Sequence, residues 1–216
     1  MIGFKINGKH SYRDYGLVLE NPYQLTPPLP KSHYVSVLGR SGQLDLTEAL
    51  TGRVEYENRI LTLELGGIKN DWPSFFTSFL NEVHGKRVEI IFDNDVTHYL
   101  IGRATVLDGF EKVARLGKFR LEVVCEPYRL DITPYNYSGN VTSTTTVTVP
   151  KSMIPVVPEI TCTIASGNTL TVSNNGEVYT LKNGKQVIQG LELFADLRLV
   201  FRGTGSVAIV ARGGCL

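Results

Sequence analysis

One stretch of the chain, residues 71–85, has the pattern of a single amphipathic helix. Asp71 is a suitable N-cap because its carboxylate can accept hydrogen bonds from the free N–H groups of the first turn, and Pro73 is tolerated in that turn. Gly85 is a normal helix stop. Apolar side chains recur at helical spacing and form one stripe, which predicts packing against a sheet. The stripe consists of Trp72, Phe75, Phe76, Phe79, Leu80 and Val83. We therefore predict a helix over residues 72–84, around which the first half of the chain is organised.

The rest of the first half is predicted to be β-strand. Asn7-Gly8 supplies the positive φ angles of a tight hairpin turn, so residues 2–19 are predicted as two strands joined there. Gly66-Gly67 is predicted to end a strand. The other predicted strands are a hairpin at residues 34–46, with a connection of about three to four residues, and residues 59–65, 87–92, 97–107 and 118–126. This set predicts a mainly β N-terminal domain, residues 1–132, with a β-barrel or split-barrel-like sheet and one α-helix.

A proline-rich segment precedes the predicted hairpin. Residues 21–30 contain Pro22, Pro27, Pro28 and Pro30. Proline fixes φ and removes a hydrogen-bond donor, so this segment is predicted to be extended and to lie outside the sheet interior. Two interpretations stay open, a surface loop or an arm that reaches a neighbouring subunit.

The composition changes after residue 132. A stretch rich in serine, threonine and proline follows, and it predicts a domain boundary. Beyond it, Asn175-Gly176, Asn183-Gly184 and residues 203–205 are each predicted to join two strands of a hairpin. The strands are predicted at residues 169–172, 177–181, 185–188, 197–201 and 206–210. Residues 133–216 are therefore predicted to form a C-terminal antiparallel β-sandwich.

The sequence contains no residue set that points to catalysis, a cofactor or a metal. A formal net charge of +1 gives no electrostatic case for a nucleic-acid partner. No segment has the pattern of a signal peptide or a transmembrane helix, so no membrane insertion is predicted. Cys125, Cys162 and Cys215 are too widely spaced for a zinc site. His84 is explained as a cation at the helix C-terminus. We predict a protein that is not an enzyme, and an unrecognised hydrolase stays open as the weakest alternative.

Short motifs along the chain match one family in their order and spacing. Residues 4–8 and 15–17 resemble its opening pattern, F-x-I-N-G followed by G-L, and residues 37–47 resemble its G-R-x-G-x-L-D hairpin. Residues 56–60 resemble its Y-x-N-R strand start, and the Glu126-Pro127-Tyr128 exit and the glycine-rich end at residues 203–216 are also similar. The chain thus resembles the distal tail proteins of long-tailed bacteriophages (siphophages) over nearly its whole length.

The resemblance implies a structural ring protein of the virion tail tip, assembled in the host bacterial cytoplasm. Its implied partners are further copies of itself in a ring, usually a homo-hexamer, the tail-tube protein, the tail-associated tip protein and receptor-binding proteins that dock on it. It also implies that the second domain is a galectin-like β-sandwich. Our candidates for the contact between copies lie in the proline-rich segment and the hairpin, and they are Pro27, Pro28, Gly39, Arg40, Gly42 and Asp45.

The main alternative is a carbohydrate-binding module that recognises host cell-wall polysaccharide. Tyr135, Tyr137 and Tyr179 could stack on sugar rings in a lectin-like groove, although tyrosines at a sandwich edge are the commoner case. The compact second half has no room for an inserted carbohydrate-binding module, which weakens this alternative.

Overall fold

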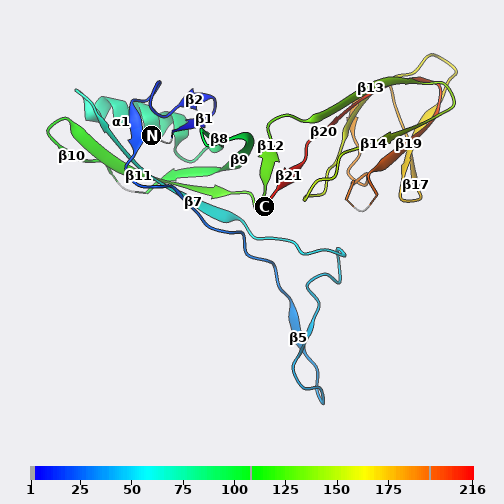
Figure 1. Cartoon of the computed structure of the whole chain (residues 1–216), viewed down its shortest axis with the longest axis horizontal. Coiled ribbons are helices and arrows are strands. Elements are labelled where there is room, and N and C mark those ends of the chain that lie inside the picture. The colour runs from blue at the N-terminus through cyan, green and yellow to red at the C-terminus, as the bar shows by residue number, and fades with distance from the viewer. Residues whose placement is uncertain (1–2, 108, 195) are drawn as a thin grey trace. The chain divides into compact units, whose positions relative to one another are not determined.

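The computed structural model describes residues 3–107, 109–194 and 196–216, and Figure 1 shows its helix and strands. Its contacts divide the chain into two compact units, which are Met1–Arg129 together with Leu216, and Leu130–Cys215. Leu216 groups with the first unit, in contrast to the sequence-based range of 133–216, because its carbonyl oxygen accepts a hydrogen bond of 2.8 Å from Arg129 Nη2. The described residues are mainly β with one helix, as predicted.

A curled, half-open barrel sheet forms the first unit. The order of its main strands is β2-β1-β8-β9-β11-β7-β3, and β4 and β10 pair with β7 and β11. The bounds are β1 Phe4–Ile6, β2 Lys9–His10, β3 Leu17–Leu19, β4 Gln24–Leu25, β7 Arg59–Ile68, β8 Arg87–Phe92, β9 Asp95–Val106, β10 Glu111–Val113 and β11 Leu116–Cys125. Inward side chains alternate along β11, where Phe119, Leu121 and Val123 are buried. This alternation confirms that one face of the sheet covers the core.

The predicted helix is confirmed as α1, Trp72–Val83. The Asp71 carboxylate accepts a hydrogen bond of 3.2 Å from the Ser74 N–H, as an N-cap should. Trp72 is almost completely buried, and its Nε1 donates a hydrogen bond of 2.8 Å to the Arg115 carbonyl oxygen. A Cβ atom at Gly117 would lie 2.3 Å from the Trp72 ring. Glycine at this position of β11 therefore gives the indole the space that it occupies.

Two strand predictions in the first unit are wrong. The second predicted strand does not run to Leu19, because the chain turns over residues 11–15 and β3 then pairs with β7 instead of with β1. The turn is stabilised by the Asp14 carboxylate, which accepts a hydrogen bond of 2.6 Å from the His10 N–H. The predicted stop at Gly66-Gly67 is also wrong, since β7 continues to Ile68. A Cβ atom at Gly67 would lie 2.6 Å from the Gly16 carbonyl oxygen, so this glycine allows β3 to approach β7.

The second unit is an antiparallel β-sandwich, as predicted. One sheet has the order β13-β20-β15-β18, and the other has the order β14-β19-β16-β17. The bounds are β13 Tyr135–Val141, β14 Thr144–Thr148, β15 Glu159–Thr163, β16 Leu170–Asn174, β17 Glu177–Thr180, β18 Gly184–Val187, β19 Arg198–Gly203 and β20 Gly205–Ala211. In addition, β12 (Arg129–Asp131) pairs with β21 (Gly214–Cys215). Ile160, Val172 and Phe201 are among the side chains buried in this unit.

Only the first of the three predicted hairpin turns in this unit joins paired strands. Asn175 and Gly176 have φ angles of 48° and 85° and connect β16 to β17. The other two predictions are wrong, because β17 and β18 lie in different sheets, and so do β19 and β20. The Asn183 side chain accepts from the Ile164 N–H and donates to the Ile164 carbonyl, so it replaces a backbone partner where the chain crosses between sheets.

The three cysteines are all free thiols, and they differ in burial. Cys125 and Cys162 are buried, and burial raises the pKa of both thiols, that of Cys125 to about 12. Because the thiolate is the reactive form, we expect maleimide to modify Cys215 rapidly in the folded protein and the other two only after denaturation. Mass spectrometry of the labelled peptides checks this. Rapid modification of Cys125 under native conditions would contradict the packing of β11 against β7.

Candidate functional site

The most exposed part of the first unit is a long excursion of the chain, residues 26–58, which we call the arm. It leaves the sheet after β4 and returns at the start of β7 (Figure 1). The N–H of Lys31 donates to the Glu55 carbonyl oxygen, and further out β5 (Tyr34–Ser36) pairs with β6 (Gln43–Asp45). No residue of the arm is buried. The arm therefore has no core of its own, and an isolated two-stranded hairpin of this kind is marginally stable in water.

The predicted hairpin is confirmed, but its connection is longer than predicted. Ser36 and Gln43 form the last pair, so residues 37–42 make a loop of six residues, which we call the hairpin loop. The Arg40 N–H donates to the Val37 carbonyl oxygen inside it, and Gly39 and Gly42 have φ angles of 82° and 77°. Two left-handed glycines allow this wider connection.

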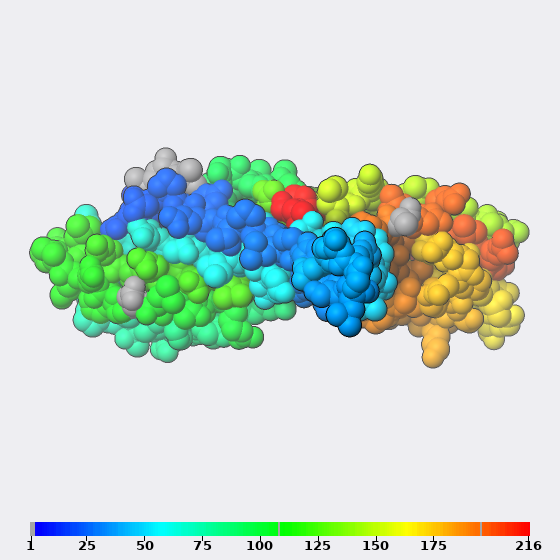
Figure 2. All heavy atoms as spheres, turned by 90° about the horizontal axis from the view of Figure 1, so that it is seen from below, coloured from blue at the N-terminus to red at the C-terminus, as the bar shows by residue number. Residues whose placement is uncertain are grey.

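The arm presents large apolar side chains to solvent. Leu38 and Leu50 have relative exposures of 102% and 99%, and Leu29, Tyr34 and Val37 are also exposed. Figure 2 looks along the arm, whose blue and cyan atoms lie near the middle of that view. Single exposed apolar residues are ordinary, but a concentration of them on a segment without a core is typical of interaction surfaces.

The six interface candidates from the sequence all belong to the arm: Pro27, Pro28, Gly39, Arg40, Gly42 and Asp45. Asp45 is already engaged, because its carboxylate accepts a hydrogen bond of 2.9 Å from the Thr47 N–H. The hydrogen bonds from Thr47 lower the pKa of Asp45. In the part of the chain that the structure describes, the Arg40 guanidinium has no ion-pair partner. Their role between copies stays a prediction.

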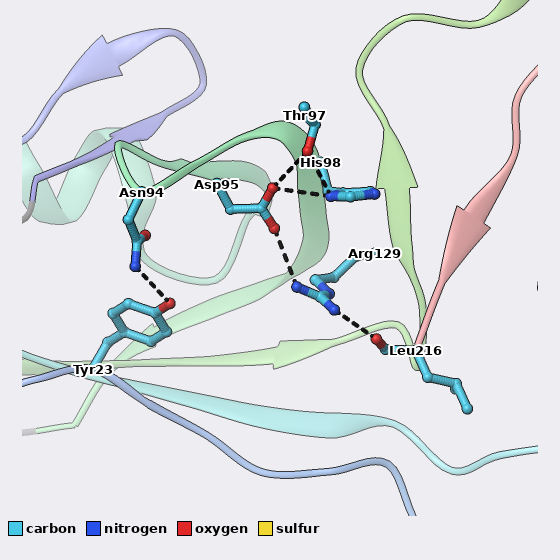
Figure 3. Close-up of polar contacts among 7 residues, drawn as sticks. All are labelled: Tyr23, Asn94, Asp95, Thr97, His98, Arg129 and Leu216. Atoms are coloured by element: carbon cyan, nitrogen blue, oxygen red, sulfur yellow. Dashed lines mark hydrogen bonds and ion pairs between the residues drawn. The ribbon is translucent and has the colours of Figure 1, made fainter.

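A polar cluster that the sequence did not indicate joins β9 to β12 (Figure 3). Asp95 Oδ1 lies 2.9 Å from His98 Nδ1 and accepts a hydrogen bond of 2.9 Å from Thr97 Oγ1. Asp95 Oδ2 accepts from Arg129 Nη1 at 3.1 Å, and Arg129 Nη2 donates to Leu216. Asp95 and Arg129 are 34 positions apart in the sequence, so no local pattern could have revealed that they meet.

Beside this cluster is a cleft of about 430 Å³. The Tyr23 ring stacks on Phe92 at 3.9 Å between centroids, and the Asn94 side chain donates to the Tyr23 hydroxyl at 3.4 Å. The polar atoms here bond mainly to one another, and nothing in the arrangement activates a nucleophile or positions a general acid opposite a base. The cluster therefore fixes the exit of the chain from the sheet.

Replacing Asp95 by asparagine tests this structural role. Partial burial opposes ionisation of Asp95, but hydrogen bonds from His98 and Thr97 outweigh it and lower the pKa. A lowered pKa stabilises the fold above the unfolded value of about 3.9 and loses that contribution as the pH falls through the folded value. We expect Asp95→Asn to cost about 1–2 kcal/mol of unfolding free energy at pH 7, with a smaller difference from wild type in acid. Chemical denaturation across pH checks this, with Glu48→Gln, which changes an exposed carboxylate of the arm, as the control that changes nothing. An equal loss at all pH values would contradict the assignment.

Two histidines act as hydrogen-bond acceptors through Nδ1. The Val106 N–H donates to His84 Nδ1 at 3.0 Å, which requires an unprotonated nitrogen at that position. The explanation of His84 as a cation at the helix end is therefore wrong, and its role is to tie the helix end to β9. His10 Nδ1 likewise accepts from the Tyr12 and Arg13 N–H groups, while its Nε2 lies 3.1 Å from Asp93 Oδ2.

The described residues hold neither a metal-binding group nor a membrane-spanning helix. Within residues 3–107, 109–194 and 196–216, no group of three or more His, Cys, Asp or Glu side chains could hold a metal ion. Over the same residues, the structure has no helix of the length and apolar character that a membrane span needs.

The tyrosines of the carbohydrate alternative lie on two different sheets. Tyr135 and Tyr137 are on β13, and Tyr179 is on β17, so each sheet carries part of the set at one of its edges. Tyr179 donates its hydroxyl to Glu177, and the Tyr137 ring lies close to Gly139. All three are half-buried. This placement favours packing at sandwich edges over a shared stacking platform.

Comparison with known proteins finds a solved structure with a similar fold. No protein-family model and no curated protein sequence matches the chain. Among solved structures, it is similar to the crystal structure of the SPP1 Dit (gp 19.1) protein, which is described as a paradigm of the hub adsorption apparatus in phages that infect Gram-positive bacteria. The two structures align over 100% of each chain with a TM-score of 0.58 and 15% sequence identity. The chain has the fold of SPP1 Dit. The likeness to SPP1 Dit covers both units, the half-open barrel and the sandwich, in the same order.

Proposed function

We propose that this protein is a structural component of a phage tail tip, a hub that assembles into a ring and does not catalyse a reaction. The observation that carries the proposal is the alignment with SPP1 Dit over the whole of both chains. Because fold alone does not establish function, the exposed arm is needed as a second, supporting observation. An arm without a core, with exposed leucines, gains its stability only when another surface covers it.

The proposed assembly is a homo-hexamer built through the first unit. In a ring each contact is heterologous, since one face of a copy meets a different face of the next. The ring would join the last ring of the tail tube to the tail-associated tip protein, and the second unit would offer a docking surface for receptor-binding proteins. On this proposal the protein is assembled in the cytoplasm of the host bacterium and resides in the virion tail tip.

Light scattering coupled to size exclusion tests the proposal on the purified full chain. We expect a concentration-dependent species whose mass is six times the 23.9 kDa of one chain. Another fixed multiple would support a ring with a different copy number. A monomer at every concentration, with or without a tail-tube protein added, would refute the proposal.

A further inference from the structure

Three Asn-Gly pairs occur in the chain, at residues 7–8, 175–176 and 183–184. In such a pair the backbone nitrogen of the glycine can attack the side-chain amide carbon of the asparagine, because glycine has no side chain to hinder the approach. The attack forms a five-membered succinimide and releases ammonia. Water then opens this ring at either carbonyl and leaves aspartate or isoaspartate. The three pairs differ in how the fold holds the asparagine side chain.

The pairs at residues 7–8 and 175–176 form turns of the same kind. Each is a two-residue connection between antiparallel strands, β1 to β2 in the first unit and β16 to β17 in the second. The φ angles are 49° and 83° in the first turn and 48° and 85° in the second. Asparagine and glycine are exposed in both turns. Backbone conformation and exposure therefore do not distinguish the two.

The side chains of Asn7 and Asn183 are held by hydrogen bonds. Asn7 Oδ1 accepts a hydrogen bond of 2.9 Å from the Glu89 N–H. The Asn183 side chain accepts from the Ile164 N–H and donates to the Ile164 carbonyl oxygen at 3.0 Å. Each amide must break these bonds before its carbon can meet the glycine nitrogen, which leaves a backbone N–H without its acceptor. The fold therefore protects both asparagines.

The Asn175 side chain is not held in this way. Among the residues that the structure describes, none forms a hydrogen bond with its amide. Gly176 lies in the turn, outside the paired residues of β16 and β17, so strand pairing does not engage its N–H. The neighbouring Asn174 fixes the turn instead, since its Nδ2 donates to two backbone carbonyl oxygens at 2.8 and 2.9 Å. The Asn175 amide can thus approach the Gly176 nitrogen without losing a hydrogen bond of its own.

We propose that Asn175 is a site of self-modification, at which the folded protein deamidates faster than at Asn7 or Asn183. The Gly176 nitrogen gives up its proton to water or hydroxide and bonds to Asn175 Cγ, and the bond from Cγ to Nδ2 breaks as ammonia leaves. One water molecule is consumed when the succinimide opens. The reaction transfers no electrons and needs no cofactor. The inference is independent of the proposed ring.

Isoaspartate at this position would loosen one edge of the sandwich. It adds a carbon atom to the backbone between residues 175 and 176, and within the described part of the chain β17 pairs with β16 alone. The turn sets the register of a two-residue hairpin, so a longer connection weakens the pairing of Glu177 with Asn174. The product also places a new negative charge close to Asp196, whose carboxylate accepts a hydrogen bond from the Asn175 N–H. Like charges at this distance repel.

Peptide mapping by mass spectrometry tests the selectivity. The purified full chain is kept at mildly alkaline pH in water enriched in heavy oxygen, so that each new carboxylate carries the label. We expect labelling at Asn175 to be at least about tenfold faster than at Asn7 or Asn183 in the folded protein. In denaturant, where no fold holds the side chains, the three rates should agree within about threefold. Equal rates at Asn7 and Asn175 in the folded protein, fastest labelling at Asn183, or no reaction at Asn175, would each overturn the proposal.

Asn175→Gly is the matched variant, because it removes the amide and keeps a residue that adopts positive φ. It should abolish the label in that peptide and leave the rates at Asn7 and Asn183 unchanged. Hydrogen exchange then reports on the consequence. After ageing, the amides of β17 should exchange at least about tenfold faster in the wild type and unchanged in the variant, with β13 unchanged in both. Isoaspartate at residue 175 without faster exchange in β17 would contradict the loosening of this edge. Neither readout depends on ring assembly.

Discussion

Truncation of Trp72 to alanine is expected to lower the unfolding free energy of the first unit by about 3–5 kcal/mol, the usual cost of removing a large aromatic side chain from a core. Trp72 is buried, stacks on Phe110 at 5.7 Å between centroids and meets Phe75 edge-on at 5.6 Å. Its hydrogen bond to the Arg115 carbonyl oxygen is lost as well. The helix would then lose its attachment to β11 at the place where Gly117 admits the indole.

The measurement needs a probe other than fluorescence, because Trp72 is the only tryptophan of the chain. Hydrogen exchange followed by mass spectrometry reports on α1 and β7 separately from the second unit. Tyr34→Ala is the matched control, since it removes an aromatic ring that is already exposed, and a change within about 0.5 kcal/mol is expected. If Trp72→Ala lowered the unfolding free energy as little as the control does, this would contradict the packing of the helix against β11 described above.

Removal of the outer arm is expected to abolish self-association without unfolding the protein. The N–H of Lys31 donates to the Glu55 carbonyl oxygen at 2.8 Å, so these residues already face each other across the two segments of the arm. Replacing residues 32–54 by Asn-Gly would close them with a two-residue hairpin turn. No residue in the deleted range is buried, so the unfolding free energy should change by no more than about 0.5 kcal/mol.

Sedimentation velocity of this deletion variant and of the full chain, at equal concentrations, checks the result. The full chain is expected to sediment as an oligomer and the variant as a monomer with unchanged circular dichroism. Leu50→Ser, which keeps the arm and its hairpin loop, should still assemble. An oligomer of unchanged size after the deletion would place the contact between copies elsewhere in the molecule.

Local sequence patterns predicted the helix and those turns that are determined by residues next to one another in the chain. The Asp71 cap and the apolar stripe of α1 were sufficient to place the helix, and the positive φ angles at Asn7-Gly8 and Asn175-Gly176 placed two turns. The errors occurred where the reason lies elsewhere in the chain. Gly67 stays inside β7 because Gly16 approaches it, and Asn183 crosses between sheets because its side chain bonds to Ile164. Neither partner can be found from the residues next to the glycine or the asparagine.

The candidate interface was also predicted only in part from the sequence. Proline content and the glycine-flanked turn indicated an exposed arm, and the structure places all six candidate residues on it. The exposed apolar row of Ile68, Leu116 and Val113 had no signal in the sequence, because its members come from separate segments and join only through strand pairing. The Asp95–Arg129 cluster was not predicted either, because its two residues are also far apart in the sequence.

Negative-stain electron microscopy of the purified, unmodified chain over a range of concentrations tests the central claim most directly. The account predicts annular particles with one copy number, whose abundance rises with protein concentration. Fields that contain only separate single molecules at every concentration and salt condition would contradict it.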